Sequence, residues 1–406
     1  MAAVTLPAFA DGTTSRAVVD LDTVTANVRA LRGHAPTAAV MAVVKADGYG
    51  HGMLPVARAA LAGGATWLGV ATAEEALALR AGLPDVDVPV LVWLLAPGAP
   101  FAALVAADVD VAVAAPWAVD EVAAGARAAG RPARVHVKVD TGLSRNGVTP
   151  TALGDVARRL AALEAAGDVQ VVGLFSHLAC ADEPGHPSID RQADAFKVAT
   201  DVLHDAGLRP AVRHLANSAA TLTRPDLHLD LVRPGISVYG FSPGPLLGPP
   251  GRYGLRPAMT LQARLAQVKQ VPAGEGVSYG HLYTTTQDTT VGLVPLGYGD
   301  GVPRHASGGT AGPGGPVAVG TGADARVLRV AGRVCMDQLV VDLGPDAAER
   351  AGDVVTLFGG SDGLAHGGDL PNAQDWADAA GTISYEIVTR LGSRVPRVHV
   401  SEGDHA

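Results

Sequence analysis

Several residue types are scarce in this 406-residue chain, and each scarcity excludes a class of protein. The two cysteines, Cys180 and Cys335, lie far apart without metal-ligand spacing, so we expect neither a disulfide framework nor a metal site. Charged residues make up 17% of the chain, against about 25% in an average globular protein. Because 48% of the residues are hydrophobic, the composition indicates a chain that buries a large core.

Basic blocks and long apolar runs are also lacking. The net charge is −9, so we do not expect nucleic acid as the main partner. No stretch reaches the roughly 18 apolar residues that a membrane-spanning helix requires, so we expect no membrane partner. The N-terminus shows no basic region followed by an apolar run, which is the pattern of a secretory signal. A cytoplasmic location is therefore the expectation.

Short β-rich runs alternate with helical segments in the first part of the chain. The runs are Val40–Val44, Trp67–Ala71, Val90–Leu94, Val109–Val113, Val135–Val139, Val171–Ser176, Val212–Leu215 and Leu229–Arg233. The helical segments between them include Ala73–Ala81, Pro116–Ala129, Thr149–Ala166 and Arg191–Ala206. This alternation predicts an α/β fold with a parallel sheet, and eight strands match a (β/α)8 TIM-type barrel. An open doubly wound sheet is the alternative, but the glycine-rich dinucleotide turn typical of that fold is absent.

The pattern changes after a segment rich in proline and glycine, Gly240–Pro257, which we interpret as a linker. Strand-like runs then follow without long helical spacers, at Met259–Gln270, Thr290–Pro295, Ala325–Val330, Gln338–Leu343, Asp353–Phe358 and Val395–Val400. Two glycine-rich stretches, Pro303–Asp324 and Gly359–Asn372, are predicted to be loops, and Ser384–Leu391 a short helix. The sequence thus predicts a barrel domain at 1–254 and a mostly-β domain at 255–406.

One lysine stands at the end of the first predicted barrel strand. Lys45 follows an apolar, β-branched run and precedes a glycine-rich turn. Lysine is rarely buried without a partner, so this position has two interpretations. Either Lys45 marks the point where the strand reaches water, or its amine lies in an apolar site that lowers its pKa and makes it a nucleophile able to form a Schiff base.

Polar residues at the ends of later strands favour the second interpretation. In a barrel they would share the carboxyl end, where active sites form. They are Lys138, Arg145, His177, Asn217, Ser218 and Arg233. Taken singly, His177 could be a core histidine whose hydrogen bonds are satisfied. Asn217 could be a helix N-cap and Arg233 a salt-bridge partner. Their common position at the same end of successive strands favours a functional site.

The ends of the last two strands predict a phosphate site. Loops at this position in barrels often bind phosphate through backbone N–H groups. The hydroxyl of Ser218 and the amides of Gly235 and Ile236 suit that role, since glycine allows close approach of the backbone. A Schiff-base lysine combined with a phosphate site indicates pyridoxal 5′-phosphate (PLP) as the cofactor.

Nine segments carry a resemblance to a known family. They are 42–52, 138–147, 176–183, 216–219, 232–236, 277–280, 297–301, 332–338 and 382–386. In this order they resemble the bacterial alanine racemases over nearly the whole chain. The resemblance implies a PLP-dependent isomerase that interconverts L-alanine and D-alanine and supplies D-alanine for peptidoglycan.

The resemblance also implies roles for individual residues. Lys45 would carry the cofactor and act as one of two bases, and Tyr279 would be the other. Further cofactor contacts would come from Tyr49, His177, Asn217, Ser218, Arg233, Gly235, Ile236 and Tyr385. Substrate contacts would come from Arg145, Met336, Asp337 and Tyr298. Lys138 matches a position that is N-carboxylated in some relatives.

Two bases suit racemisation, because a proton must leave one face of Cα and return to the other. In this family Tyr279, Tyr298, Met336 and Asp337 reach the active site of the partner subunit. The resemblance therefore implies a head-to-tail homodimer with shared active sites. Three positions depart from the family pattern: Phe175 stands where many relatives have tyrosine, Pro234 replaces a bulky apolar residue, and Leu143-Ser144 varies a stretch that carries glycine and methionine.

The sequence bears on three alternatives to alanine racemisation. A non-catalytic vitamin B6-binding barrel would lack the β domain that follows Pro257. A barrel-type decarboxylase would require an acidic residue, in place of Arg233, to protonate the cofactor ring. A racemase of broader specificity, acting on serine for example, stays open because one hydroxyl or methylene changes binding by only about 1–3 kcal/mol.

Overall fold

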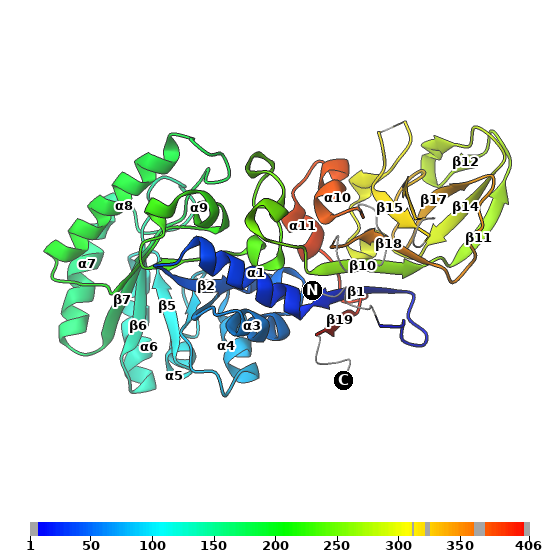
Figure 1. Cartoon of the computed structure of the whole chain (residues 1–406). Helices are drawn as coiled ribbons and strands as arrows, with labels where there is room; N and C mark the ends of the chain where they lie inside the picture. The colour runs from blue at the N-terminus through cyan, green and yellow to red at the C-terminus, as the bar shows by residue number, and fades with distance from the viewer. Residues whose placement is uncertain (1–6, 311, 321–324, 361–369, 402–406) are drawn as a thin grey trace. The chain divides into compact units, whose positions relative to one another are not determined.

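The computed structural model describes residues 7–310, 312–320, 325–360 and 370–401. Its backbone contacts divide the chain into two units (Figure 1). The barrel unit comprises Val24–Gly48 and Met53–Leu255. The β unit comprises the segment that ends at Thr23, the short insertion Tyr49–Gly52 and the chain from Arg256 onward. The first strand, β1 (Ser15–Asp20), belongs to the β unit because it pairs with strands there. The division into domains 1–254 and 255–406 that the sequence suggests stays a prediction.

The sheet of the barrel unit has eight strands in the order β8-β7-β6-β5-β4-β3-β2-β9, and all of its pairings are parallel. The strands are β2 (Ala39–Val43), β3 (Trp67–Val70), β4 (Val90–Val92), β5 (Val109–Val113), β6 (Ala133–Lys138), β7 (Val169–Phe175), β8 (Val212–His214) and β9 (Leu231–Val232). The Asp230 amide donates to the carbonyl of Arg213 at 3.1 Å and links the two ends of the sheet. The predicted TIM-type barrel is therefore confirmed, and each of the eight predicted runs contains one strand or most of it.

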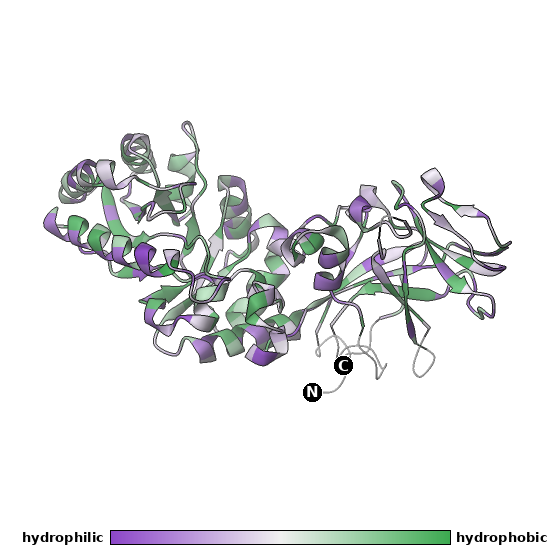
Figure 2. Cartoon of the chain, turned by 90° about the horizontal axis from the view of Figure 1, so that it is seen from above, coloured by the Kyte–Doolittle hydropathy of each residue, from purple (hydrophilic) through white to green (hydrophobic). Residues whose placement is uncertain are grey.

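Helices surround this sheet (Figure 1). They are α1 (Leu21–His34), α3 (Met53–Ala62), α4 (Ala73–Gly82), α5 (Phe101–Ala106), α6 (Trp117–Ala129), α7 (Pro150–Ala165), α8 (Ser188–Asp205) and α9 (Ser218–Thr223). Figure 2 shows hydrophobic and hydrophilic positions together on these helices, as expected where one face covers a sheet and the other meets solvent. The four helices named from the sequence are confirmed, with ends that differ by a few residues.

The barrel interior contains a compact apolar cluster. Met41, Leu91, Ala112, Phe175 and Leu231 are all buried there, and each comes from a different strand. Burial of a large apolar side chain contributes about 1.5–3 kcal/mol, so this cluster favours closure of the sheet. The continuous apolar strands of the sequence are explained by this interior on one face and helices on the other.

The described residues of the β unit form three sheets. The largest has the order β16-β15-β18-β10-β1-β19, a second has the order β11-β14-β17, and β12 pairs with β13. The strands are β10 (Met259–Arg264), β11 (Gln267–Val271), β12 (Gly276–Val277), β13 (Tyr283–Thr284), β14 (Thr289–Val294), β15 (Pro316–Val319), β16 (Arg326–Arg329), β17 (Leu339–Gly344), β18 (Val354–Phe358) and β19 (Arg397–Val400). Its described residues also form two α-helices, α10 (Ala373–Ala380) and α11 (Ser384–Thr389). The predicted mostly-β character is confirmed.

Three sequence expectations for the β unit were wrong in part. The predicted loop Pro303–Asp324 contains β15, a buried strand that glycine on both sides, and proline before it, concealed. The predicted run Met259–Gln270 is divided between β10 and β11. Helix α10 was not expected, although Asn372 caps it and Asp375 completes a capping box. Much of the second predicted loop, Gly359–Asn372, lies outside the described residues.

Within the described ranges, no helix is both long enough and apolar enough to cross a bilayer.

The N-terminus of α4 generates a testable prediction. The Thr72 hydroxyl accepts from the Glu75 amide, and the Glu75 carboxylate accepts from the Thr72 amide, which is the capping box expected from the sequence. We expect Thr72→Ala to lower the free energy of unfolding by about 1 kcal/mol, measured as a shift of the urea midpoint. Thr149 is the matched control, because it precedes α7 without a side-chain capping bond. An equal shift for Thr149→Ala would contradict the assignment.

Candidate active site

Lys45 begins a left-handed turn at the carboxyl end of β2. The next five residues, Ala46–Gly50, all have positive φ angles, between 52° and 78°. Left-handed backbone is unfavourable by roughly 1–2 kcal/mol for each residue other than glycine. Strain of this kind persists only where the surrounding structure imposes it, and it is often found at functional sites.

Side chains from two directions hold this turn. The Glu75 carboxylate, already part of the α4 capping box, accepts from the Ala46 amide at 2.6 Å. The Asp47 carboxylate accepts from the Met53 amide at 2.8 Å, and the Gly48 amide donates to the carbonyl of Val44 at 2.8 Å. The backbone that carries Lys45 is thus attached to the start of α4 and to the start of α3.

Positive charge collects around Lys45. Burial lowers the pKa of the Lys45 amine, the charge of Arg145 lowers it further, and Glu75 acts in the opposite direction. Burial also lowers the pKa of Lys138, which the charges of Arg233, Arg145 and Lys45 bring to about 8 against the opposing effect of Asp140. Two amines with reduced proton affinity therefore share the carboxyl end of the barrel.

His177 lies in the same positive field. Burial, followed by the charges of Arg233, Arg145, Lys138 and Lys45, lowers its pKa to about 3. The imidazole is therefore neutral at physiological pH. It offers a flat, uncharged ring beside a group of cations.

Arg233 is the most constrained of these cations. Its Nη2 donates to the carbonyl of Ser176 at 2.6 Å, and its Nη1 lies 3.3 Å from Nδ1 of His214. The centre of the guanidinium is 5.5 Å from the centroid of the Phe175 ring, which also lies 5.7 Å from the Lys138 amine. The residue where many relatives have tyrosine is thus an aromatic surface for two cations.

The predicted phosphate residues lie together after β8 and β9. The amides of Gly235 and Ser237 both donate to the Ser218 hydroxyl, at 2.9 and 3.5 Å. Asn217 is the N-cap of α9, where its side chain accepts from the Ala220 amide at 3.1 Å. Asn217 thus has the capping role that was one of its two interpretations, and the backbone of Gly235 is directed toward Ser218.

The remaining predicted residues lie in the β unit and form two groups there. The rings of Tyr49 and Tyr385 are 6.3 Å apart, and burial raises the pKa of Tyr49, which keeps its phenol protonated. Tyr279, Tyr298, Met336 and Asp337 come from three segments that contact one another. The Tyr298 amide donates to the carbonyl of Cys335 at 2.9 Å, and Arg333 Nε donates to the carbonyl of Tyr279 at 3.2 Å.

Charge and exposure distinguish this second group. Arg394 donates to Asp337 and to Asp300, both at 2.8 Å. Tyr279 is 72% exposed, Met336 54% and Tyr298 41%, although large apolar and aromatic side chains are usually more buried. Three exposed side chains of this group therefore lie on the surface together with the Asp337–Arg394 ion pair.

Sequence reasoning missed several residues that support the site. It did not predict that Glu75 accepts a hydrogen bond from the turn after Lys45, or that this turn is left-handed. It assigned no role to three buried ionisable residues of the barrel interior, Asp110, His136 and His214. A signal was available for Asp110, because it is the one polar residue in its strand.

The fold and this site together define a class, the (β/α)8-barrel enzymes whose reactive groups lie at the carboxyl ends of the strands. Two family models match the chain, the alanine racemase N-terminal domain over residues 19–243 and the alanine racemase C-terminal domain over residues 258–399. The chain belongs to the alanine racemase family.

Individual relatives agree with this assignment. An alanine racemase of Streptomyces coelicolor is 59% identical over 394 residues, which covers 96% of each chain. The crystal structure of alanine racemase from D-cycloserine-producing Streptomyces lavendulae has a TM-score of 0.91 and 53% identity, with 98% of this chain and 99% of that chain covered. The biosynthetic alanine racemase from Pseudomonas aeruginosa has a TM-score of 0.80 at 36% identity, over 95% of this chain and 99% of its own.

The unusual proton affinity of Lys138 can be measured. In protein kept free of carbon dioxide, we expect the Lys138 amine to lose a proton near pH 8, followed by NMR of protein labelled at lysine Cε, with Lys138→Arg to assign the signal. Unfolded lysine titrates near 10.5, so the unfolded chain binds more protons between these values and the fold gains stability as the pH rises from 8 to 10.5. Exposed Lys197 is the control. Titration of Lys138 near 10.5 would contradict the buried, cation-rich setting.

Proposed function

We propose that this protein interconverts L-alanine and D-alanine with bound PLP, and that the D-alanine supplies cell-wall peptidoglycan. The observation that carries the proposal is the Lys45 amine, which has a lowered pKa and stands at the carboxyl end of a barrel strand among other cations. Membership of the alanine racemase family over nearly the whole chain supports the same activity.

The residues present fit PLP. The cofactor is an anion, and Lys45, Lys138, Arg145 and Arg233 supply positive charge that Asp140 and Glu75 oppose only in part. An amine with lowered pKa is suited to imine formation with an aldehyde. Ser218, with the backbone of Gly235 and Ile236 beside it, offers the short polar groups that a phosphate requires.

Individual residues would hold different parts of the cofactor. Lys45 would hold it covalently, and Ser218, Gly235, Ile236, Tyr49 and Tyr385 would bind the phosphate, with Asn217 fixing the position of Ser218. Neutral His177 would lie against the ring. Arg233 would donate to the pyridine nitrogen, and because a guanidinium does not give up its proton, that nitrogen would stay unprotonated.

The bound cofactor withdraws electrons from Cα of the amino acid and so makes its proton removable. Lys45 takes or returns this proton on one face, since its lowered pKa increases the fraction of free amine near neutral pH. Tyr279 does so on the other face. Inversion at Cα needs both groups, because a single base would return the proton to the side from which it came.

Substrate recognition is assigned to four further residues. Arg145 and the backbone of Met336 would bind the substrate carboxylate, with Asp337 and Tyr298 at the entrance. Lys138 would be carboxylated by carbon dioxide: its unprotonated amine, which a pKa of about 8 makes available, forms the N–C bond and releases one proton to solvent. The product would be an anion beside Arg145 and would reduce the excess of positive charge.

We assign the active form to a head-to-tail homodimer. The exposed side chains of Tyr279, Met336 and Tyr298 form an apolar surface of the kind that a protein partner covers. In the dimer they would enter the active site of the partner subunit. Each site would then combine Lys45 of one chain with the tyrosine base of the other.

A racemisation assay tests the activity. The wild-type protein should convert each alanine enantiomer into the other and turn over serine more slowly, as measured by chiral chromatography. Lys45→Ala should abolish conversion, and borohydride reduction followed by mass spectrometry should find the cofactor's mass on the Lys45 peptide of the wild type only. Lys197→Ala is the matched control, because that lysine is exposed on α8. A Lys45→Ala variant with normal turnover would refute the proposal.

Shared active sites can be tested by mixing two inactive variants. Lys45→Ala and Tyr279→Ala should each be inactive alone. If each site combines the two chains, random reassociation gives one intact site in each mixed dimer and about a quarter of wild-type activity. If both bases act within one chain, no mixed dimer has an intact site and the mixture stays inactive.

A further inference from the structure

Three ionisable side chains lie in the interior of the barrel, and the proposed reaction assigns them no task. Asp110 on β5, His136 on β6 and His214 on β8 are each 0% exposed. Buried ionisable groups are unfavourable unless they are hydrogen-bonded, so their presence requires a reason.

These residues form a continuous chain of hydrogen bonds that ends at Arg233. Arg233 Nη1 lies 3.3 Å from His214 Nδ1, and His214 Nε2 lies 2.9 Å from His136 Nδ1. His136 Nε2 is in turn 3.2 Å from Asp110 Oδ2. The Asp110 carboxylate also accepts from Arg134 Nε at 2.6 Å and from Nη2 at 3.2 Å.

The pattern assigns every proton in this chain. A guanidinium only donates, so His214 Nδ1 must accept and its single proton must be on Nε2. That proton is donated to His136 Nδ1, which places the proton of His136 on Nε2, facing Asp110. Burial lowers the pKa of His214 well below its ordinary value and the charge of Arg233 adds to the effect, so this imidazole is neutral.

Packing fixes the two imidazole rings in the required orientations. The Phe175 ring stacks on His214, with centroids 4.8 Å apart and planes 6° from parallel. Trp67 contacts His136 edge to face, with centroids 5.5 Å apart. A Cβ atom on Gly173 would lie 2.1 Å from His136 Nδ1, so only glycine leaves room for this ring on β7.

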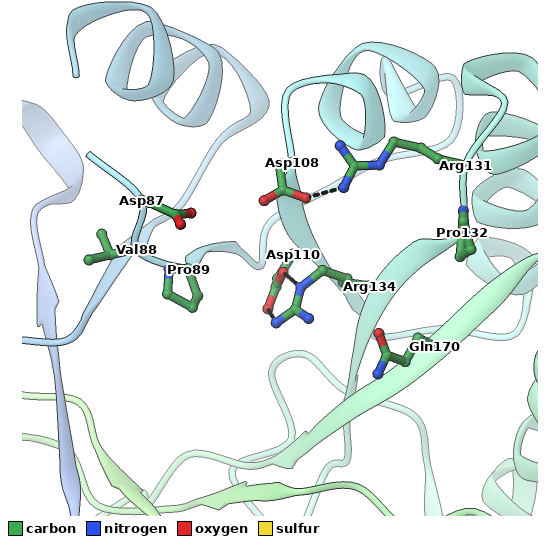
Figure 3. Close-up of a pocket in the computed structure, with 9 residues that line it drawn as sticks. All are labelled: Asp87, Val88, Pro89, Asp108, Asp110, Arg131, Pro132, Arg134 and Gln170. Atoms are coloured by element: carbon green, nitrogen blue, oxygen red, sulfur yellow. Dashed lines mark hydrogen bonds and ion pairs between the residues drawn. The ribbon is translucent and has the colours of Figure 1, made fainter. Parts of the chain in front are cut away.

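The end of the hydrogen-bond chain opposite Arg233 reaches a cleft at the N-terminal ends of the strands. Figure 3 shows Asp110 with Arg134, and beside them a second pair, Asp108 with Arg131. The cleft has a volume of about 430 Å³, and Asp87 and Gln170 also line it. For Asp110, burial raises the pKa, but hydrogen bonds from His136 and Arg134 and the charge of Arg134 outweigh this effect and the net shift is downward. Asp110 is therefore an anion held by Arg134.

We propose that Asp110, His136 and His214 are positioning residues that orient Arg233 toward the cofactor. Anionic Asp110 selects the tautomer of His136, which selects that of His214, so that an acceptor always faces the guanidinium. The reversed tautomers would direct an N–H of His214 at Arg233 and displace it. The inference rests on the proposed function, because it concerns the arginine assigned to the pyridine nitrogen.

The tautomers can be measured without any variant and without cofactor. In protein with ¹⁵N-labelled histidine, NMR should find an unprotonated Nδ1 and a protonated Nε2 for both His136 and His214. A proton on Nδ1 of His214 would overturn the proposal, whatever the activity of the enzyme. This measurement also decides the case if a substitution in the chain prevents folding.

A matched pair of variants tests the consequence for the cofactor. Asp110→Asn replaces the anion with an amide that can turn either a donor or an acceptor to His136, so both tautomers of both histidines should be populated. Cofactor binding should weaken about tenfold, as is typical when a group that orients a ligand-binding residue is lost. The visible absorbance of the bound cofactor should shift as well.

Asp108→Asn is the control, because Asp108 pairs with Arg131 in the same cleft but is not part of the hydrogen-bond chain. It should leave the tautomers, the affinity and the absorbance unchanged. Single tautomers and unchanged affinity in Asp110→Asn would refute the positioning role. The racemisation assay decides the proposed function separately, since the histidine tautomers do not depend on turnover.

Discussion

The gathering of positive charge at one end of the barrel is the constraint on which the site depends. A closed parallel sheet directs the carboxyl ends of all its strands to the same rim, so side chains distant in sequence become neighbours. Here that geometry brings together Lys45, Lys138, Arg145 and Arg233 with little opposing charge. The repulsion and the loss of hydration lower the proton affinity of both lysines, which is unfavourable for the empty protein and favourable for an anionic ligand. The lowered proton affinity of the two lysines and the attraction of an anionic ligand have the same physical origin.

The surrounding structure must hold these groups where they would not stay unaided. The backbone after Lys45 is left-handed over five successive residues, a conformation that Glu75 and Asp47 stabilise through hydrogen bonds to main-chain amides. Glu75 serves two structures at once, since the same carboxylate closes the capping box of α4. The start of a helix and the reactive lysine are therefore positioned by one side chain.

Polar residues in the barrel interior also combine two structural tasks. Barrels are commonly filled by apolar layers, but here Asp110, His136 and His214 occupy part of the interior and connect one rim of the sheet to the other. Such buried polar chains are unfavourable unless every member is satisfied. Along this chain of hydrogen bonds each donor has an acceptor, from Arg233 at one end to the Asp110–Arg134 pair at the other. The interior thus combines support for the sheet with control of one arginine.

The sequence by itself determined the class of fold, because eight apolar runs separated by helical segments leave few alternatives to a parallel barrel. It also predicted which residues form the candidate site, since polar residues at strand ends converge in such a fold, and the family motifs indicated the same positions. It failed where local pattern is weak: β15 was hidden by its glycine-rich flanks, and β1 by partners that are distant in the chain.

Only the tertiary structure decided how the site residues behave. The proton affinity of Lys138 depends on burial and on charges from other strands, which no local pattern encodes. The left-handed turn after Lys45 is imposed against the intrinsic preference of its residues by contacts with α3 and α4. The tautomers of His136 and His214 follow from distances between three strands. These properties arise from the arrangement of groups in space, and residue identities alone do not contain them.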